Sequence, residues 1–198
     1  MTTSNGRTSQ YPIDPMFLDR WSPRSFSGES IDEPLLMTIL EAASWAPSAA
    51  NRQPWRFIYF VRDDASFQQG LDLLDAGNQL WVKSASALVF IVSDTLSRKP
   101  DGTTSPLRSH SFDAGAAWAM LALQALKSGL AAHAMGGVDF ERAASVLRVP
   151  ADHKIEAAVA IGRIADKSLL PENLRQREVP NDRRPLGQMV FRHIFGAG

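Results

Sequence analysis

Segments with helical and with strand periodicity alternate along the 198-residue chain, and this alternation strongly constrains the fold. Apolar residues spaced three and four apart predict helices over residues 32–46, 65–74, 110–129 and 139–147. Short runs of β-branched, aromatic or small apolar residues predict strands over residues 55–62, 86–93, 131–135 and 155–161. A chain that interleaves helices and strands in this way folds as an α/β or an α+β protein.

We expect a single domain over residues 14–198, because domains usually contain about 100 to 200 residues. Residues 1–13 are polar and lack apolar periodicity, which predicts a flexible N-terminal arm or an extension that wraps a partner. Residues 94–109 predict a long loop that could cover a site. An extended tail is expected over 166–184, followed by a short helix over 186–194.

The predicted helix over residues 110–129 carries apolar residues on nearly all sides, among them Ala114, Trp118, Met120 and Leu121. A helix that is apolar all round has to be buried all round. A single chain of this length offers one such position at most. A second copy of the chain would cover the remaining face, so the pattern predicts a homodimer.

Composition excludes several classes of function. Lys plus Arg and Asp plus Glu both total 21, so no basic excess favours nucleic acid as a partner. The chain has no cysteine, which excludes disulfides, thiolate metal sites and thiol nucleophiles. Redox chemistry would therefore have to come from a cofactor. The polar N-terminus and the short apolar runs predict neither a secretory signal nor a membrane span, and we expect a cytoplasmic location.

The four histidines are scattered singly along the chain, so we assign no metal site. His110, Ser111 and Asp113 superficially suggest a hydrolytic triad, but neighbours on one helix point in different directions. A polar helix start is the better interpretation. Common phosphate-binding, zinc-protease and serine-hydrolase motifs are also missing.

Two arginines flank a hydroxyl in residues 19–26. Arg20, Ser22 and Arg24 could clamp a phosphate and a second anionic or carbonyl group, although a solvated basic turn is the simpler interpretation. Two further segments are unusual. Pro47 and Pro54 frame a loop with a hydroxyl and two amides, and a pair of glycines at 136–137 precedes a helix and could bring backbone N–H groups to a flat ligand.

Together these segments resemble the nitroreductase family of FMN-dependent oxidoreductases over most of the chain. The most specific mark is the A-P-S-x-x-N-x-Q-P-W loop at residues 46–55. The other matching segments, in chain order, are Arg20-Trp21-Ser22-Pro23-Arg24, Asp113-Ala114-Gly115, Gly136-Gly137, Ile161-Gly162-Arg163 and Arg183-Arg184-Pro185-Leu186.

The resemblance implies an α+β homodimer with a central mixed sheet flanked by helices, and FMN at the dimer interface in contact with both subunits. Arg20 and Ser22 match positions at the flavin phosphate and ribityl chain, and Arg24 matches the cation at the pyrimidine edge of the ring. Arg183, or less favourably Arg184, matches a second phosphate-binding cation. The other implied cofactor-binding residues are Trp21, which departs from the usual basic residue, Pro47, Ser48, Asn51, Gln53 and Asn78, together with Gly136 and Gly137 near flavin N5.

The implied activity is hydride transfer from NADH or NADPH through FMN to a small acceptor such as a nitroaromatic, a quinone or an enone. The protein positions the reactants, so no side-chain acid–base pair is required and we assign no catalytic residue. Three alternatives stay open. They are a flavin-binding sensor or storage protein without turnover, an enzyme of the same fold with specialised flavin chemistry, and a scaffold that has lost FMN.

Overall fold

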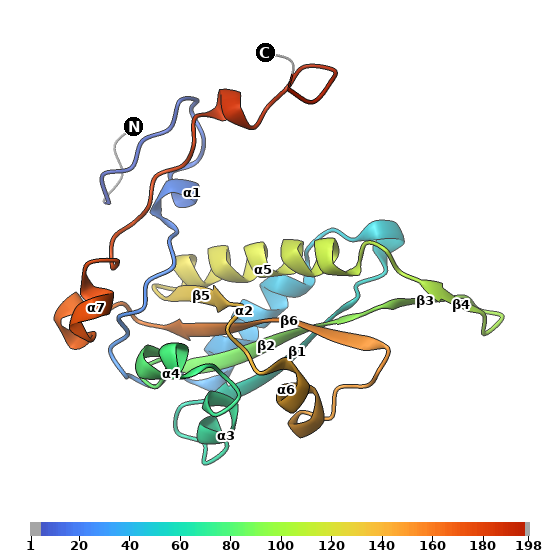
Figure 1. Ribbon diagram of the computed structural model, residues 1–198, viewed down its shortest axis with the longest axis horizontal. Helices are drawn as coiled ribbons and strands as arrows, with labels where there is room; N and C mark the ends of the chain where they lie inside the picture. The colour runs from blue at the N-terminus through green and yellow to red at the C-terminus, as the bar shows by residue number, and fades with distance from the viewer. Residues whose placement is uncertain (1–4, 197–198) are drawn as a thin grey trace.

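A computed structural model of the chain describes residues 5–196 (Figure 1). Helices and strands alternate as expected. The helices are α1 (Pro15–Asp19), α2 (Glu33–Ser44), α3 (Phe67–Leu71), α4 (Ala76–Val82), α5 (His110–Lys127), α6 (Phe140–Val146) and α7 (Glu172–Arg175). The strands are β1 (Trp55–Val61), β2 (Ala87–Asp94), β3 (Leu96–Arg98), β4 (Thr104–Pro106), β5 (Ala131–Met135) and β6 (His153–Gly162). Short 3₁₀ turns lie at Ala49–Asn51, Lys167–Leu169 and Leu186–Gln188.

The central sheet has four strands in the order β1-β2-β6-β5. The α+β class is confirmed, but the expectation of a mixed sheet is wrong for the described part of the chain, because all three strand pairs are antiparallel. Helices α3 and α4 lie in the segment that connects β1 to β2, and the path of this segment explains why these two strands are antiparallel. It returns the chain at the end of the sheet where β1 finishes, so that Val61 lies opposite Ala87.

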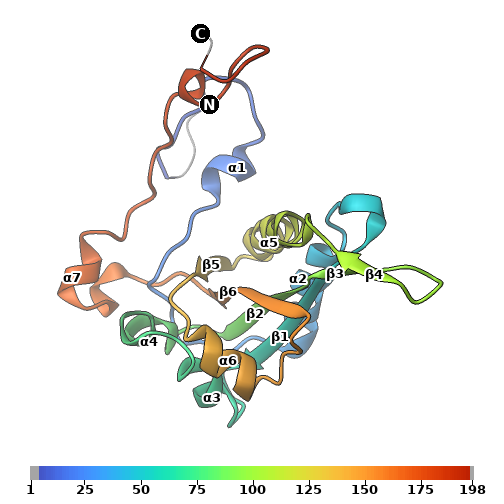
Figure 2. The same cartoon turned by 45° about the vertical axis from the view of Figure 1, so that its right-hand side comes forward.

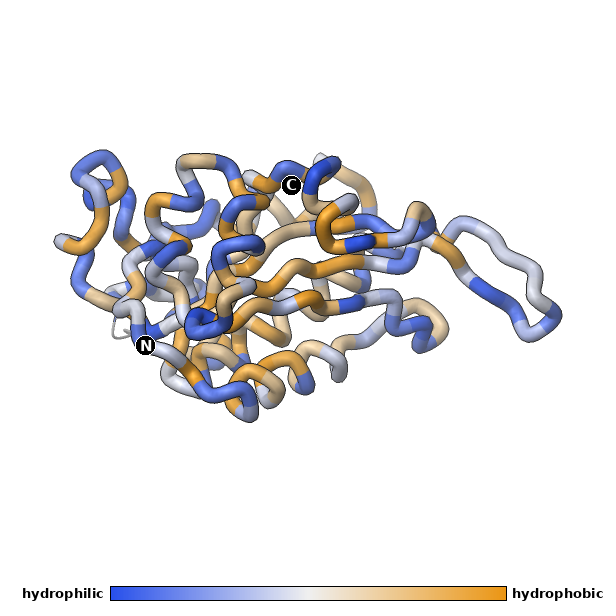
Figure 3. Tube along the Cα trace, turned by 90° about the horizontal axis from the view of Figure 1, so that it is seen from below, coloured by the Kyte–Doolittle hydropathy of each residue, from blue (hydrophilic) through white to orange (hydrophobic). Residues whose placement is uncertain are grey.

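Helices cover both faces of the sheet and give two hydrophobic cores (Figure 2). Helices α2 and α5 pack on one face, and α3, α4 and α6 pack on the other. Strand β2 is buried along its whole length because alternate side chains enter the two cores. Phe90 enters one core and Ile91 the other. Figure 3 shows the apolar residues concentrated along these interior strands.

Helix α2 forms where the capping and apolar pattern predicts it. The Asp32 carboxylate accepts a hydrogen bond from the Leu35 N–H, and Leu36 and Ile39 are fully buried. Helix α5 also lies where expected, and within one chain only one of its faces is covered, so burial all round would need the second copy that the sequence predicts. Phe112 is 82% exposed and Met120 is 40% exposed, whereas the opposite face packs on the sheet and on α2.

Other predictions are corrected in detail. Residues 94–109 are not an irregular loop, because β3 and β4 pair as an antiparallel hairpin that projects from the body (Figures 1 and 3). The helix expected over 186–194 is reduced to the 3₁₀ turn Leu186–Gln188, and the tail over 166–184 contains α7. Helices α1 and α4 were not predicted. No helix among residues 5–196 is long and apolar enough to cross a membrane.

The N-terminal segment and the end of the chain leave the body together and lie side by side (Figures 1 and 2). Arg7, which belongs to the arm expected to be flexible, is only 7% exposed. Its guanidinium donates to the carbonyl oxygens of Arg20 at 2.9 Å and Asn181 at 3.4 Å. Arg7 thus links the beginning of the described chain to its last segment, while residues 1–4 of the expected arm lie outside the described residues.

Candidate functional site

A cavity of about 190 Å³ lies where the segment after α1 meets β5 and the C-terminal segment. Three of the predicted cations, Arg20, Arg24 and Arg183, meet in its wall. Arg20 Nη1 donates to the Ser22 hydroxyl at 3.2 Å, which joins the predicted hydroxyl to the group. Among the described residues, no Asp or Glu side chain lines the cavity. Its complete lining is Arg7, Arg20, Trp21, Ser22, Arg24, His133, Arg177, Val179, Asn181 and Arg183.

The guanidinium groups of this arginine cavity repel one another. Burial lowers the pKa of Arg20 below its usual value, and the nearby charges of Arg183 and Arg7 lower it further. Burial and the charge of Arg177 lower the pKa of Arg24, whereas Glu178 opposes this shift. A bound anion would relieve the repulsion, so the cavity is suited to an anionic group such as a phosphate monoester.

His133 is a cavity residue that the sequence analysis missed. Its Nδ1–H donates to the Pro23 carbonyl at 2.9 Å, and its ring packs against Trp81 with 4.7 Å between centroids. Burial, reinforced by the charges of Arg24 and Arg20, lowers the pKa of His133 to about 4. The ring is therefore neutral at pH 7. It fastens the arginine-bearing segment to β5 without adding another positive charge.

Arg7 and Arg177 were also missed. Each lies in a polar segment without periodicity, so no local pattern distinguishes it from a solvated arginine.

The two adjacent arginines that were predicted as alternatives differ in position. Arg184 lines a second cavity of about 560 Å³ between the two terminal segments, and Arg183 alone of the predicted pair reaches the arginine cavity.

The predicted glycine turn follows β5 directly. The Gly137 carbonyl accepts hydrogen bonds from the Asn78 side chain at 3.2 Å and from the Asp75 N–H at 3.1 Å. A Cβ atom at Gly137 would collide with the Asp75 carboxylate and the Asn78 amide, whereas one at Gly136 would meet nothing within 4 Å. The structure therefore brings Asn78 and the glycine turn together, and any larger residue at 137 would have to displace the Asp75 and Asn78 side chains.

The proline-framed loop has an unusual backbone. Ala50, Asn51 and Gln53 have φ angles of 48°, 53° and 48°, in the left-handed region that residues other than glycine rarely adopt. The Ser48 hydroxyl accepts a hydrogen bond from the Gln53 N–H at 3.0 Å and helps to hold this shape. Local strain of this kind is often found at binding sites and is supported by the surrounding structure.

This loop and the arginine cavity do not meet within one chain. The loop lies at the beginning of α5, where the Ala49 N–H donates to the Asp113 carboxylate. The segment after α1 and strand β5, which both contribute residues to the cavity, lie toward the other end of α5 (Figures 1 and 2). Asn51 and Gln53 are exposed. The two groups of predicted site residues would therefore combine only if a second chain contributed one of them.

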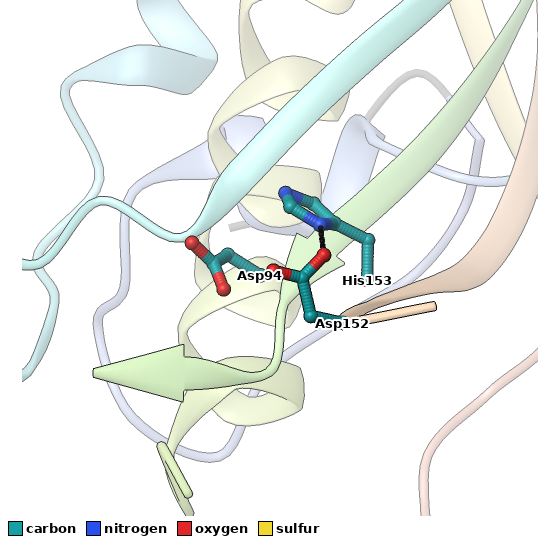
Figure 4. Close-up of side chains that lie close together, drawn as sticks. All are labelled: Asp94, Asp152 and His153. Carbon is teal, nitrogen blue, oxygen red and sulfur yellow. Dashed lines mark hydrogen bonds and ion pairs between the residues drawn. The ribbon is translucent and has the colours of Figure 1, made fainter. Parts of the chain in front are cut away.

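A separate cluster contains Asp94, Asp152 and His153, whose potential ligand atoms lie within 4.8 Å of one another (Figure 4). His153 Nδ1 lies 2.7 Å from Asp152 Oδ1. Arg98 forms ion pairs with both Asp94 and Asp152. Because one guanidinium already pairs with both carboxylates, we do not assign the cluster as a metal site.

Fold and site together define an α+β protein with an arginine-lined cavity and a loop of unusual backbone conformation toward opposite ends of one long helix. A model of the nitroreductase family matches residues 18–74 and 61–163, which is most of the chain. The chain belongs to the nitroreductase family.

Solved structures and a curated relative agree with this membership. A crystal structure described as an oxidoreductase containing FMN is 49% identical, with a TM-score of 0.97 and 100% coverage of both chains. A protein from Desulfovibrio desulfuricans, assigned as a nitroreductase and solved in complex with FMN, is 26% identical, with a TM-score of 0.70 and coverage of 94% of this chain and 99% of that one. The NADH dehydrogenase of Thermus thermophilus is 29% identical over 204 residues, covering 88% of this chain and 92% of the relative.

Proposed function

We propose that this protein is an FMN-dependent oxidoreductase. The observation that carries the proposal is the arginine cavity, in which Arg20, Ser22 and Arg183 present guanidinium and hydroxyl donors with no lining carboxylate among the described residues. This donor set suits the terminal phosphate of FMN. The FMN-containing structures with the same fold support the assignment.

FMN bound there would supply hydride chemistry at N5, with NADH or NADPH as donor and a nitroaromatic, quinone or enone as acceptor. The chain's own groups bind and orient it. Arg24 would place a positive charge at the pyrimidine edge of the ring, and Gly136 leaves room for the ring to approach the backbone. Trp21 lines the cavity beside these groups, and Asn78 holds the glycine turn through its hydrogen bond to the Gly137 carbonyl.

We further propose that the protein acts as a homodimer with FMN at its interface. The arginine cavity is lined by none of Pro47, Ser48, Asn51 and Gln53 of the same chain, so a second copy would supply them to each site. The exposed face of α5, with Phe112 and Met120, is available to pack against that copy. A closed two-fold dimer would form two equivalent sites.

The direct test is the absorption spectrum of the purified protein, followed by anaerobic addition of NADH or NADPH. Flavin bands that bleach, and return on addition of a nitroaromatic or quinone, would support the proposal. Bound flavin that neither nucleotide reduces would instead favour a sensor, a store or specialised flavin chemistry. A protein that cannot be reconstituted with FMN would overturn the assignment of the cavity.

A further inference from the structure

Glu178 is a buried carboxylate behind the arginine cavity. Its side chain is 3% exposed although it follows α7 in a largely exposed segment. Its Oε1 accepts hydrogen bonds from the backbone N–H groups of Arg24 at 2.7 Å and Ser25 at 2.8 Å. The C-terminal segment is thus fastened to the backbone of the residue whose side chain enters the cavity.

The second carboxylate oxygen of Glu178 differs from the first in its hydrogen bonding. Oε2 is buried and has no hydrogen-bond partner, and it lies 3.9 Å from Nη1 of Arg24. Burial of a carboxylate oxygen without a donor is unfavourable unless a nearby positive charge compensates it. Arg24 supplies this charge, but its guanidinium also lines the cavity. The Arg24 guanidinium therefore faces both the buried Glu178 carboxylate and the interior of the cavity, where a ligand would bind.

We propose that Glu178 is a positioning residue that holds Arg24 beside the flavin and reduces the positive charge that Arg24 presents to it. The inference rests on the proposed function, because it requires FMN in the cavity. A cation at the pyrimidine edge stabilises the negative charge gained on reduction, and a carboxylate behind that cation opposes this effect. Glu178 accordingly lowers the reduction potential of the bound flavin.

Glu178→Gln separates the charge from the hydrogen bonds. A glutamine side-chain oxygen can still accept from the N–H groups of Arg24 and Ser25, but the negative charge is lost. We expect the equilibrium constant for flavin reduction to rise at least tenfold, which corresponds to about 30 mV for a two-electron couple. The measurement is anaerobic titration of the FMN-loaded protein against a reference dye of known potential.

Two further variants distinguish this role from a general loss of charge or of structure. Glu172→Gln removes an exposed carboxylate from nearby α7 and is expected to leave the potential unchanged. In an Arg24→Gln background, the effect of Glu178→Gln on the potential is expected to be smaller, because the part of the effect that depends on how Glu178 holds Arg24 is lost with the guanidinium. An equal shift in that background would overturn the inference.

An FMN-loaded Glu178→Gln variant whose reduction potential equals that of the wild type would also overturn the inference. If Glu178→Gln does not fold, Glu178→Asp provides the second test, because it withdraws the charge by one methylene and is expected to raise the potential by a smaller amount. An unchanged potential in Glu178→Asp would contradict the proposal equally. Wild-type protein that does not bind FMN would overturn the proposed function itself, and the inference with it.

Discussion

The Asp113 carboxylate accepts a hydrogen bond from the Ala49 N–H at 3.2 Å and thereby ties the first turn of α5 to the proline-framed loop. The same oxygen accepts from the Ser109 hydroxyl at 2.9 Å, and Asp113 is buried. A negative charge at the beginning of a helix is also favoured by the helix dipole. One buried carboxylate therefore stabilises the helix start and anchors the loop whose next residue, Ala50, has a left-handed backbone.

Asp113→Asn tests this anchor. The amide oxygen can still accept both hydrogen bonds, but the negative charge that strengthens them and favours the helix start is lost, so we expect a loss of about 1–3 kcal/mol in the free energy of unfolding. Urea denaturation measures this loss. Asp101→Asn, on the exposed tip of the β3–β4 hairpin, is the control and should change stability by less than about 0.5 kcal/mol. Equal effects of the two substitutions would show that Asp113 is not an anchor.

The arginine cavity predicts a difference between two adjacent arginines. Arg183→Ala removes a guanidinium from the cavity, whereas Arg184→Ala removes one from outside it. A charge-assisted hydrogen bond contributes about 1.5–3 kcal/mol, so Arg183→Ala should weaken FMN binding by roughly 10- to 100-fold. Quenching of FMN fluorescence measures the affinity. Arg184→Ala is expected to bind within a few fold of wild type, and the opposite order would contradict the placement of the phosphate.

The two glycines of the turn should respond differently to alanine. Gly137→Ala forces a Cβ into the Asp75 carboxylate and the Asn78 amide and should cost about 1–3 kcal/mol of stability. Gly136→Ala meets open space and should leave the unfolding free energy nearly unchanged. If the flavin lies against this turn, Gly136→Ala will nevertheless weaken FMN binding. Thermal unfolding of the FMN-free proteins, together with FMN titration, separates the two effects.

His133 predicts a pH dependence of stability. Its pKa falls from 6.5 to about 4 on folding, so the unfolded chain binds more protons between these values. Stability due to neutral His133 is complete above pH 6.5 and is lost as pH falls toward 4. His133→Gln should therefore reduce the fall of the melting temperature over this window. His193→Gln, in the exposed C-terminal segment, should retain the wild-type slope. Identical slopes for wild type and His133→Gln would contradict a buried neutral ring.

Local patterns predicted most of the regular elements because burial in this fold is periodic. Helix α2 and strands β1, β2, β5 and β6 lie close to their predicted positions. Helix α4 was missed because its first turn contains glycine and asparagine, and it depends on the Asp75 cap and on burial of Trp81. The β3–β4 hairpin was missed because its short strands are largely exposed and lack alternation.

The residues of the candidate site likewise separate into those that a local sequence pattern predicts and those that it does not. Arg20, Ser22, Arg24 and the glycine turn could be proposed from motifs, because each motif is contiguous or nearly so in the sequence. Asn78 was supported only by its spacing to the following strand. His133, Arg177 and Glu178 could not, because each is a single residue without a local pattern. Their proximity to the site depends on the path of the C-terminal segment and on the register of β5.

The sequence by itself determined the succession of helices and strands, the capped and apolar faces, and the residue types on which the proposed phosphate and flavin site depends. Only the tertiary structure decided that Arg183 and not Arg184 enters the arginine cavity, that all pairs of the described sheet are antiparallel, and that the proline-framed loop lies away from the cavity. Periodicity and capping are local interactions that neighbouring residues specify. Cavities, charge repulsion and buried ion pairs arise between segments that are distant in sequence, and they exist only once the cores have packed.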